Sequence, residues 1–276
     1  MTIVDGKILA EQILLGLKTE LRRLPFQPVF CDVLVGEDPV ARSYVNIKGR
    51  RAEEIGLDFQ LLEVPASIST DELIQRLQEV QNRPYLSGLI VQMPLPAGLD
   101  TRRILDAIIP RVDVDCLGSR NSERFYSGRP RLIPPTASAV MEILKLLKLD
   151  STKKKILIIG KGELVGRPVA FLLKQQGLNV ITADNLTQNL PSLALTADVI
   201  ISGTGQPGLI TGDYIKLGAV IIDCGTAESA GSIVGDVDLG SVAAKASFVS
   251  PVPGGVGPVT VACLLANVVA IAKEFK

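Results

Sequence analysis

Tyr44 and Lys48 lie four residues apart in the stretch ARSYVNIKGRRAEEIG, which has the composition of a helix. Residues at positions i and i+4 share one helix face, so the phenol and the amine are predicted neighbours. The chain contains no histidine, so an enzyme built from it needs another group to transfer protons. Arg42, Arg50 and Arg51 occupy the same helix. If Lys48 is partly buried beside them, desolvation and like charge favour its neutral, basic form. In the alternative interpretation, Lys48 is a solvated surface cation and Tyr44 is an aromatic residue at an interface.

Polar residues also follow apolar runs where strands are predicted to end. Gln92 follows the run GLIV, and Asp113 and Asp115 alternate in the segment DVDC. A carboxylate at a strand end can accept two parallel hydrogen bonds from an amidine-like ring edge. Acids that only shape a turn are the alternative interpretation. No third acid accompanies the pair at metal-ligand spacing, so we expect no metal site.

A glycine-rich turn is predicted between a strand and a helix in ILIIGKGELVG, at Gly160, Gly162 and Gly166. Backbone N–H groups and the helix dipole favour a phosphate there, although a tight turn without a ligand is the alternative. Asp184 closes the next strand, VITAD, where an acid can bind an adenosine ribose hydroxyl. Lys161 would instead attract a 2′-phosphate, so the residues leave NAD and NADP both open.

The segment SPVPGGVGPVT is unusually rich in residues that restrict or free the backbone. Six of the eight residues from Pro251 to Pro258 are proline or glycine, including Pro253, Gly254 and Gly255. Glycine lets another group approach the backbone closely, and proline keeps a loop rigid. We predict that this loop forms one wall of a ligand site; a stiff hinge is the alternative.

The elements that must position these residues follow from hydrophobic periodicity. Helices are predicted over residues 5–24, 39–56, 69–82, 136–147 and 259–272, with a capping box from Ser69 to Glu72. Strands are predicted over residues 29–36, 59–65, 88–96, 153–160, 179–184, 198–203, 219–225 and 248–253. Strands that alternate with helices indicate right-handed crossovers and parallel sheets, whose sites collect at the carboxyl ends of the strands. The expected fold class is α/β, with two domains.

Composition excludes several classes of protein. The chain has 276 residues, 29 basic and 29 acidic side chains and 47% hydrophobic residues, so no overall field favours nucleic acid or an anionic membrane. Residues 246–272 carry no charge, but prolines and glycines leave a continuous run too short for the roughly 20 residues of a membrane span. Four scattered cysteines and a charged N-terminus without a secretory pattern predict reduced thiols and a cytoplasmic protein.

Six segments together resemble the bifunctional methylenetetrahydrofolate dehydrogenase/methenyltetrahydrofolate cyclohydrolase family. They are SYVNIKGRRAEEIGL, GLIVQMPLP, DVDC, GELVGRPVAFLL, GDVD and SPVPGGVGPVTVACLLAN, and they occur in the family's order over nearly the whole chain. The resemblance implies a folate-binding catalytic domain over residues 1–136, completed by a C-terminal helix at 257–276. It also implies a Rossmann-like dinucleotide-binding domain over 137–256, a cleft between the two, and a homodimer.

The resemblance also implies roles for single residues. Lys48 matches the catalytic lysine, Tyr44 and Gln92 its positioning partners, and Asp115 the acid that holds the pterin ring. Pro253, Gly254 and Gly255 are then expected at the folate, and the arginines at 42, 50 and 51 near its glutamate tail. The expected cofactor-binding set is Gly160, Lys161, Gly162, Gly166, Asp184, Asn185 and Thr226.

Departures from the family pattern concentrate around the cofactor. The family's Gly-Arg-Ser is here Gly160-Lys161-Gly162, its His-Ser is Asp184-Asn185, and its Gly-Ile-Asn is Gly225-Thr226-Ala227. Loss of the arginine guanidinium, which binds phosphate through two hydrogen bonds, and loss of a serine hydroxyl both weaken phosphate binding. The resemblance favours NADP, with tetrahydrofolate as the substrate carrier, whereas the local charges favour NAD.

The leading hypothesis is therefore an enzyme that oxidises 5,10-methylenetetrahydrofolate and hydrolyses the methenyl product to 10-formyltetrahydrofolate. One alternative is a cyclohydrolase alone, with a degenerate dinucleotide site. Another is a silent folate or nucleotide sensor. An unrelated hydroxy-acid dehydrogenase would explain the glycine-rich turn but not the tyrosine–lysine pair.

Overall fold

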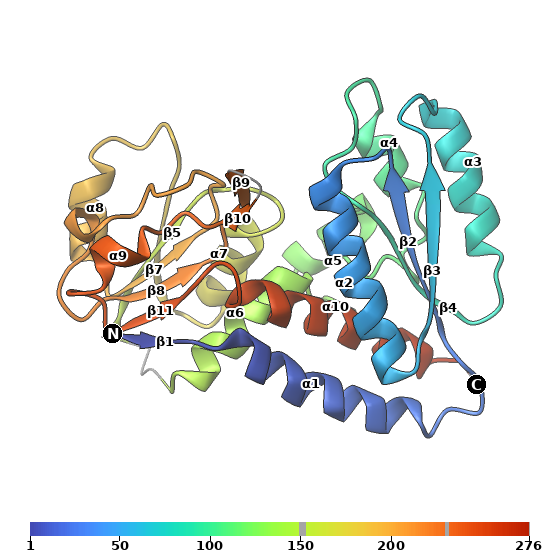
Figure 1. The fold of residues 1–276 in the computed structure, drawn as a ribbon, viewed down its shortest axis with the longest axis horizontal. Coiled ribbons are helices and arrows are strands. Elements are labelled where there is room, and N and C mark those ends of the chain that lie inside the picture. Colours follow the sequence, from blue (N-terminus) through green and yellow to red (C-terminus); the bar gives the residue numbers. More distant parts are fainter. Residues whose placement is uncertain (149–152, 230–231, 276) are drawn as a thin grey trace. The chain divides into compact units, whose positions relative to one another are not determined.

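The computed structural model describes residues 1–148, 153–229 and 232–275, which form two compact units (Figure 1). One unit, here the small-sheet unit, comprises residues 11–135 and 261–276 and contains a three-stranded sheet. The other, the large-sheet unit, comprises residues 1–10 and 136–260 and contains a six-stranded sheet. Two long helices, α1 (Gly6–Leu21) and α10 (Val256–Ala272), contribute residues to both units.

The small-sheet unit is built on three parallel strands in the order β3-β2-β4. They are β2 (Val29–Val35), β3 (Asp58–Val64) and β4 (Leu86–Val91), and the helices around them are α2 (Pro39–Ile55), α3 (Thr70–Gln81), α4 (Thr101–Asp106) and α5 (Ser119–Tyr126). All residues of β2 and β4 are buried, as expected for parallel strands covered on both faces. The predicted parallel sheet is confirmed.

The ends of α2 and α3 follow from local chemistry that the sequence displays. The Asp38 side chain accepts a hydrogen bond of 2.6 Å from the Ala41 amide at the start of α2, and Gly56 ends that helix at φ 108°. The predicted capping box of α3 is present, with Ser69 and Glu72 bonded reciprocally.

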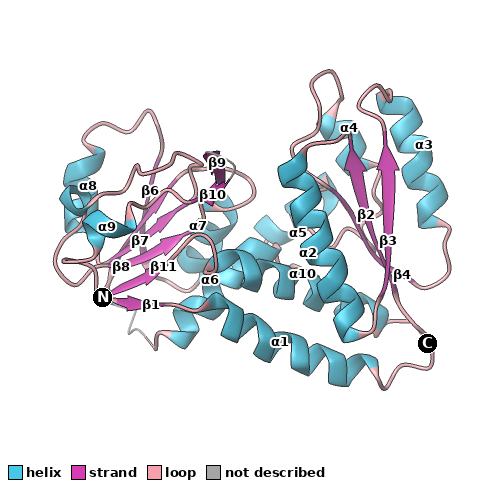
Figure 2. Cartoon of the chain, in the orientation of Figure 1, coloured by secondary structure: helices cyan, strands magenta, loops and turns pink. Residues whose placement is uncertain are grey.

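The large-sheet unit contains six parallel strands in the order β1-β11-β8-β7-β5-β6 (Figure 2). They are β1 (Thr2–Ile3), β5 (Lys155–Ile159), β6 (Asn179–Ala183), β7 (Val199–Ser202), β8 (Val220–Asp223) and β11 (Phe248–Ser250). The connecting elements are α6 (Pro135–Leu146), α7 (Gly166–Gln175), α8 (Leu190–Thr196), a 3₁₀ turn (Gly212–Tyr214), the antiparallel pair β9 (Ala227–Ser229) and β10 (Ser232–Val234), and α9 (Leu239–Val242).

The first ten residues depart from the expected organisation. The family resemblance implies one domain over residues 1–136, but residues 1–10 belong to the large-sheet unit. The reason is strand pairing, because the Thr2 amide donates to Ser247 O at 2.8 Å and the Val4 amide to Val249 O at 2.9 Å. Among the helices of the described residues, none has both the length and the hydropathy needed to cross a bilayer.

Candidate active site

Lys48 lies in the packed interface between α2 and β2. Alternate residues of β2 face opposite sides of the sheet, and Leu34 on the α2 side packs against Ala41 and Val45. Asp32 shares that side of the strand, and Lys48 follows Val45 by one turn of α2. Lys48 is consequently only 7% exposed, and its Nζ lies 2.6 Å from Asp32 Oδ2.

Gln92 holds the same amine from a second strand. It follows β4 directly, and its backbone N–H donates to Val33 O at 2.9 Å across the sheet. The Lys48 Nζ donates to Gln92 Oε1 at 2.7 Å, while the Gln92 side-chain amide donates to Met93 O at 3.1 Å. The second bond fixes the carboxamide so that its oxygen faces the amine. Lys48 is thus oriented by two polar side chains from neighbouring strands.

Asp32 is the residue of this cluster that the sequence analysis missed. It is fully buried, and burial raises the pKa of its carboxyl above 3.8, against the opposing effects of Lys48 and the Val33 N–H. Asp32 and Lys48 have the same total charge whether the proton sits on the amine or on the carboxylate. The pair can therefore present a neutral amine without changing the net charge of the buried site.

Lys48 is buried, but its ion-pair partner is an acid, and the arginines of its helix have partners of their own. The charged group nearest to the amine is the Asp32 carboxylate, which has the opposite sign. Each arginine of α2 pairs instead with a glutamate: Arg42 with Glu63, Arg50 with Glu54, and Arg51 with both Glu11 and Glu54. Tyr44 is half-buried on α2, one turn before Lys48.

The two acids of the DVDC segment have different surroundings. Asp113 is a buried turn acid that accepts hydrogen bonds from the amides of Leu117 and Gly118 and from the Asn121 side chain. Asp115 is half-buried and accepts no side-chain or backbone hydrogen bond from the described residues. Burial raises the pKa of Asp115 to about 6, Lys48 opposes the rise, and Asp113 and Asp32 add to it. Asp115 thus lies within the electrostatic field of Lys48 and has free acceptor capacity.

In the large-sheet unit, the glycine-rich turn connects β5 to α7. A Cβ on Gly166 would lie 1.8 Å from Gly160 O, and one on Gly160 would lie 2.5 Å from Gly203 O, so both glycines permit close backbone packing. A Cβ on Gly162 would have no atom within 4 Å, so the backbone there borders open space. This open turn before a helix fits a dinucleotide phosphate. At the same edge, Lys161 Nζ lies 2.7 Å from Asp184 Oδ2.

The proline-glycine loop of residues 251–255 packs against the start of α1. Gly6 donates its N–H to Gly254 O at 2.9 Å, and a Cβ on Gly6 would lie 1.8 Å from Gly255 O. Gly254 has φ 100°, which favours glycine. A Cβ on Gly255 would lie 2.4 Å from Pro251 O, so backbone geometry and close packing account for both loop glycines within the unit. A contact of Pro253, Gly254 and Gly255 with a ligand stays a prediction.

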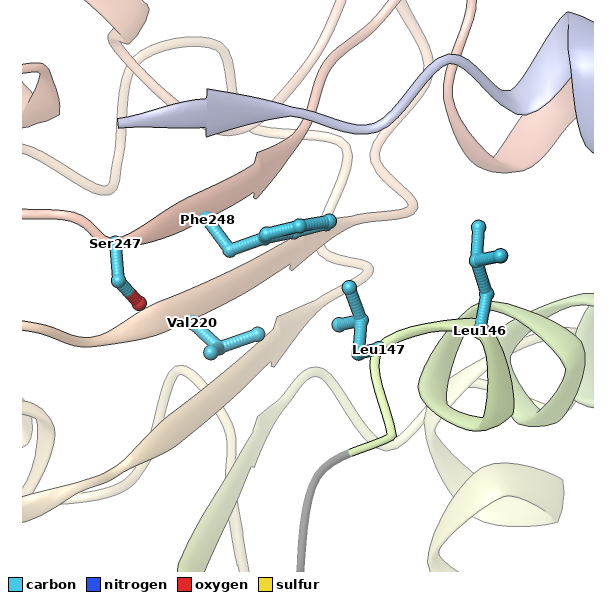
Figure 3. A pocket seen from close by; sticks show the side chains of 5 residues that line it. All are labelled: Leu146, Leu147, Val220, Ser247 and Phe248. Carbon is cyan, nitrogen blue, oxygen red and sulfur yellow. The ribbon is translucent and has the colours of Figure 1, made fainter.

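An apolar cavity of about 340 Å³ lies elsewhere in the large-sheet unit (Figure 3). Its lining residues are Leu146, Leu147, Val220, Ser247 and Phe248. Val220 and Phe248 are the first residues of β8 and β11, so the cavity lies at the amino ends of the strands. The glycine-rich turn and Asp184 lie at the opposite, carboxyl edge, so this cavity is not the phosphate site.

Comparison with known proteins decides the family. The model of the tetrahydrofolate dehydrogenase/cyclohydrolase catalytic domain matches residues 4–115, and that of the family's NAD(P)-binding domain matches residues 134–276. The chain belongs to this family. The bifunctional protein FolD of Nautilia profundicola is 38% identical over 279 residues, covering 100% of this chain and 98% of the relative.

Two solved structures of family members agree with the fold. The FolD methylenetetrahydrofolate dehydrogenase/cyclohydrolase of Campylobacter jejuni has a TM-score of 0.94 at 34% identity and covers 99% of both chains. The Trypanosoma brucei enzyme, solved with NADP and an inhibitor, has a TM-score of 0.94 at 32% identity and covers 99% of this chain and 97% of its own. The predicted family and two-domain α/β fold are confirmed.

Two further buried acids of this family member escaped the sequence analysis. Asp223, which ends β8, accepts hydrogen bonds from the amides of Gly225 and Asp236, and burial raises its pKa to about 6. Asp236 accepts from the Ser202 hydroxyl at 2.6 Å and from the amides of Thr204 and Gln206. These acids fix the loops at the carboxyl ends of β7 and β8. The GDVD motif, whose first acid is Asp236, was the available signal for that residue.

The predicted site residues therefore fall into two groups. Tyr44, Lys48, Gln92 and Asp115 belong to the small-sheet unit, where the structure brings Lys48 and Gln92 into contact. Lys161 and Asp184 contact each other in the large-sheet unit. Asn185 and Thr226 are exposed just beyond β6 and β8, at the same carboxyl edge.

Proposed function

We propose that this chain oxidises 5,10-methylenetetrahydrofolate with NAD(P) and hydrolyses the methenyl product to 10-formyltetrahydrofolate. The observation that carries the proposal is the buried amine of Lys48, held by Asp32 and Gln92 in a member of this family. The small-sheet unit is the proposed folate-binding unit, and the large-sheet unit the proposed dinucleotide-binding unit. We further propose that the protein is a cytoplasmic homodimer.

The oxidation needs orientation more than proton transfer. The nicotinamide of a bound dinucleotide supplies the hydride acceptor. The backbone N–H groups around Gly162 receive the phosphates, while Asp236 and Asp223 keep the neighbouring loops in place. Asp115 accepts hydrogen bonds from the amidine-like edge of the pterin and so orients the methylene carbon.

The hydrolysis needs a base, and Lys48 is the proposed one. Water attacks the methenyl carbon while the neutral amine accepts a proton from that water. The proton then passes to the folate nitrogen whose bond to the carbon breaks. One methenyl cation and one water give one formyl product and one proton. Gln92 orients the amine throughout, and Asp32 stores the proton when the amine is neutral.

The decisive experiment is a pair of spectrophotometric assays on the same preparation. Oxidation of methylenetetrahydrofolate is followed with NAD and with NADP, and hydrolysis is followed from the methenyl absorbance without any dinucleotide. The proposal predicts both reactions. Hydrolysis alone would show a monofunctional cyclohydrolase, and tight folate binding without either reaction would show a sensor. Sedimentation velocity tests the proposed homodimer separately.

A further inference from the structure

An ion pair at the carboxyl edge of the large sheet bears on the choice of dinucleotide. β5 and β6 are parallel neighbours, with Ile159 opposite Ala183, so Lys161 and Asp184 follow their strands at the same edge of the sheet. The Gly160 amide donates to Ala183 O at 2.8 Å, which joins the two loops. Lys161 Nζ and Asp184 Oδ2 then meet at 2.7 Å.

The Asp184 carboxylate is fixed from its other side. Its Oδ1 accepts a hydrogen bond of 3.1 Å from the Leu186 amide and one of 3.0 Å from the Thr187 hydroxyl. The Thr187 hydroxyl oxygen in turn accepts a hydrogen bond of 2.9 Å from the Asp184 backbone amide. Hydrogen bonds from Lys161 and Thr187 lower the pKa of Asp184, so the group stays ionised at neutral pH. A phosphate placed here would be repelled by the negative charge of Asp184, whose hydrogen bonds hold the carboxylate in position.

We propose that Asp184 selects NAD over NADP, and that Lys161 acts as its counter-ion instead of as a free phosphate ligand. This inference rests on the proposed dinucleotide-binding role of the large-sheet unit. An acid at the end of the second strand of such a fold accepts hydrogen bonds from the ribose hydroxyls of NAD. A 2′-phosphate replaces one of those hydroxyl donors by an anion and is repelled by the carboxylate.

Lys161 does not compensate for that repulsion. The ion pair has no net charge, so it offers little attraction to a group carrying nearly two negative charges. A phosphate could pair with the Lys161 ammonium group only if that group moved away from Asp184. The Asp184 carboxylate would then be left unpaired beside the phosphate. Lysine also lacks the planar fork with which arginine binds phosphate through two bonds.

The test is isothermal titration calorimetry of the whole protein with NAD and with NADP. The wild type is expected to bind NAD at least tenfold more tightly. Asp184→Asn keeps the size of the side chain but removes its charge, and should reduce the preference for NAD at least tenfold. Asp213→Asn, at an exposed acid of the 3₁₀ turn in the same unit, is the matched control and should leave the preference within twofold.

Three results would overturn the inference: wild type that binds NADP at least as tightly as NAD, an unchanged preference in Asp184→Asn, or no binding of either dinucleotide. Hydrolysis of the methenyl substrate, measured without dinucleotide, separates such a failure from failure of the proposed function. Both this hydrolysis and the oxidation of methylenetetrahydrofolate with NADP continue if only the inference about Asp184 is wrong, whereas oxidation with neither dinucleotide means that the proposed function fails as well.

Discussion

Replacing Lys48 by methionine removes the proposed base while keeping an unbranched side chain of similar length. The substitution leaves the fully buried Asp32 carboxylate without its counter-charge. Removing one partner of a buried ion pair typically costs about 3–5 kcal/mol. Proton uptake by Asp32 reduces that cost, because burial already raises the pKa of this carboxyl above its unfolded value.

The pH dependence of stability has a defined sign in the Lys48→Met variant. Lys48 opposes the rise in the pKa of Asp32, so its loss raises that pKa further. A group whose pKa is higher in the folded state stabilises the fold at low pH and loses this contribution as the pH rises through the folded value. Urea unfolding should therefore show a deficit relative to wild type that is small near pH 4 and grows toward pH 8.

The catalytic effect of Lys48→Met should be larger than its effect on folate binding. General acid–base groups typically contribute about 10²–10⁴-fold to a rate, so hydrolysis should fall at least about 100-fold. The assay follows methenyl absorbance, with folate affinity measured by calorimetry. Lys145→Met makes the same chemical change at an exposed helix position and should hydrolyse like wild type. Hydrolysis within threefold of wild type in Lys48→Met would refute the role of the amine.

The structure supports two further predictions. Because the pKa of Asp115 is about 6, binding of a stable folate analogue should be about tenfold weaker at pH 5 than at pH 7 by calorimetry, and nearly independent of pH in Asp115→Asn. If folate-analogue binding by Asp115→Asn still depended on pH, another titrating group would control binding. Gly166→Ala places a Cβ 1.8 Å from Gly160 O and should lower the free energy of unfolding by about 2 kcal/mol. Gly162→Ala places its Cβ in open space and should change the free energy of unfolding by less than about 0.5 kcal/mol. The Gly162 variant should nevertheless bind a dinucleotide more weakly. Equal unfolding midpoints in urea would contradict the assigned packing.

Local features of the fold could be predicted from the sequence because their determinants are neighbours in the chain. The capping box of α3 and the glycine that ends α2 are examples. β1 could not be predicted, because a two-residue strand has no periodicity and its partner β11 lies about 245 residues further along the chain.

The candidate site was predicted only in part for the same reason. Lys48 and Gln92 were identified from the sequence, but Asp32 was not, since a single acid inside the apolar run VFCDVLV gives no sign of its partner. The partner depends on how α2 packs over β2, which is a tertiary property. The partners of the α2 arginines were only partly predictable, because two of their four ion pairs reach other elements, through Glu63 of β3 and Glu11 of α1. The alternate positions of Asp113 and Asp115 suggest two acids that act together. Among the described residues, nearby backbone amides donate hydrogen bonds to Asp113 and not to Asp115.

The central claim is that the Lys48 amine acts on the one-carbon centre of a folate bound beside Asp115. A crystal structure of the protein with a folate analogue tests this claim most directly. The account predicts that Nζ lies within hydrogen-bond reach of the one-carbon position, still in contact with Gln92, and that the Asp115 carboxylate meets the pterin edge. An analogue bound away from Lys48, or a pterin without contact to Asp115, would contradict it.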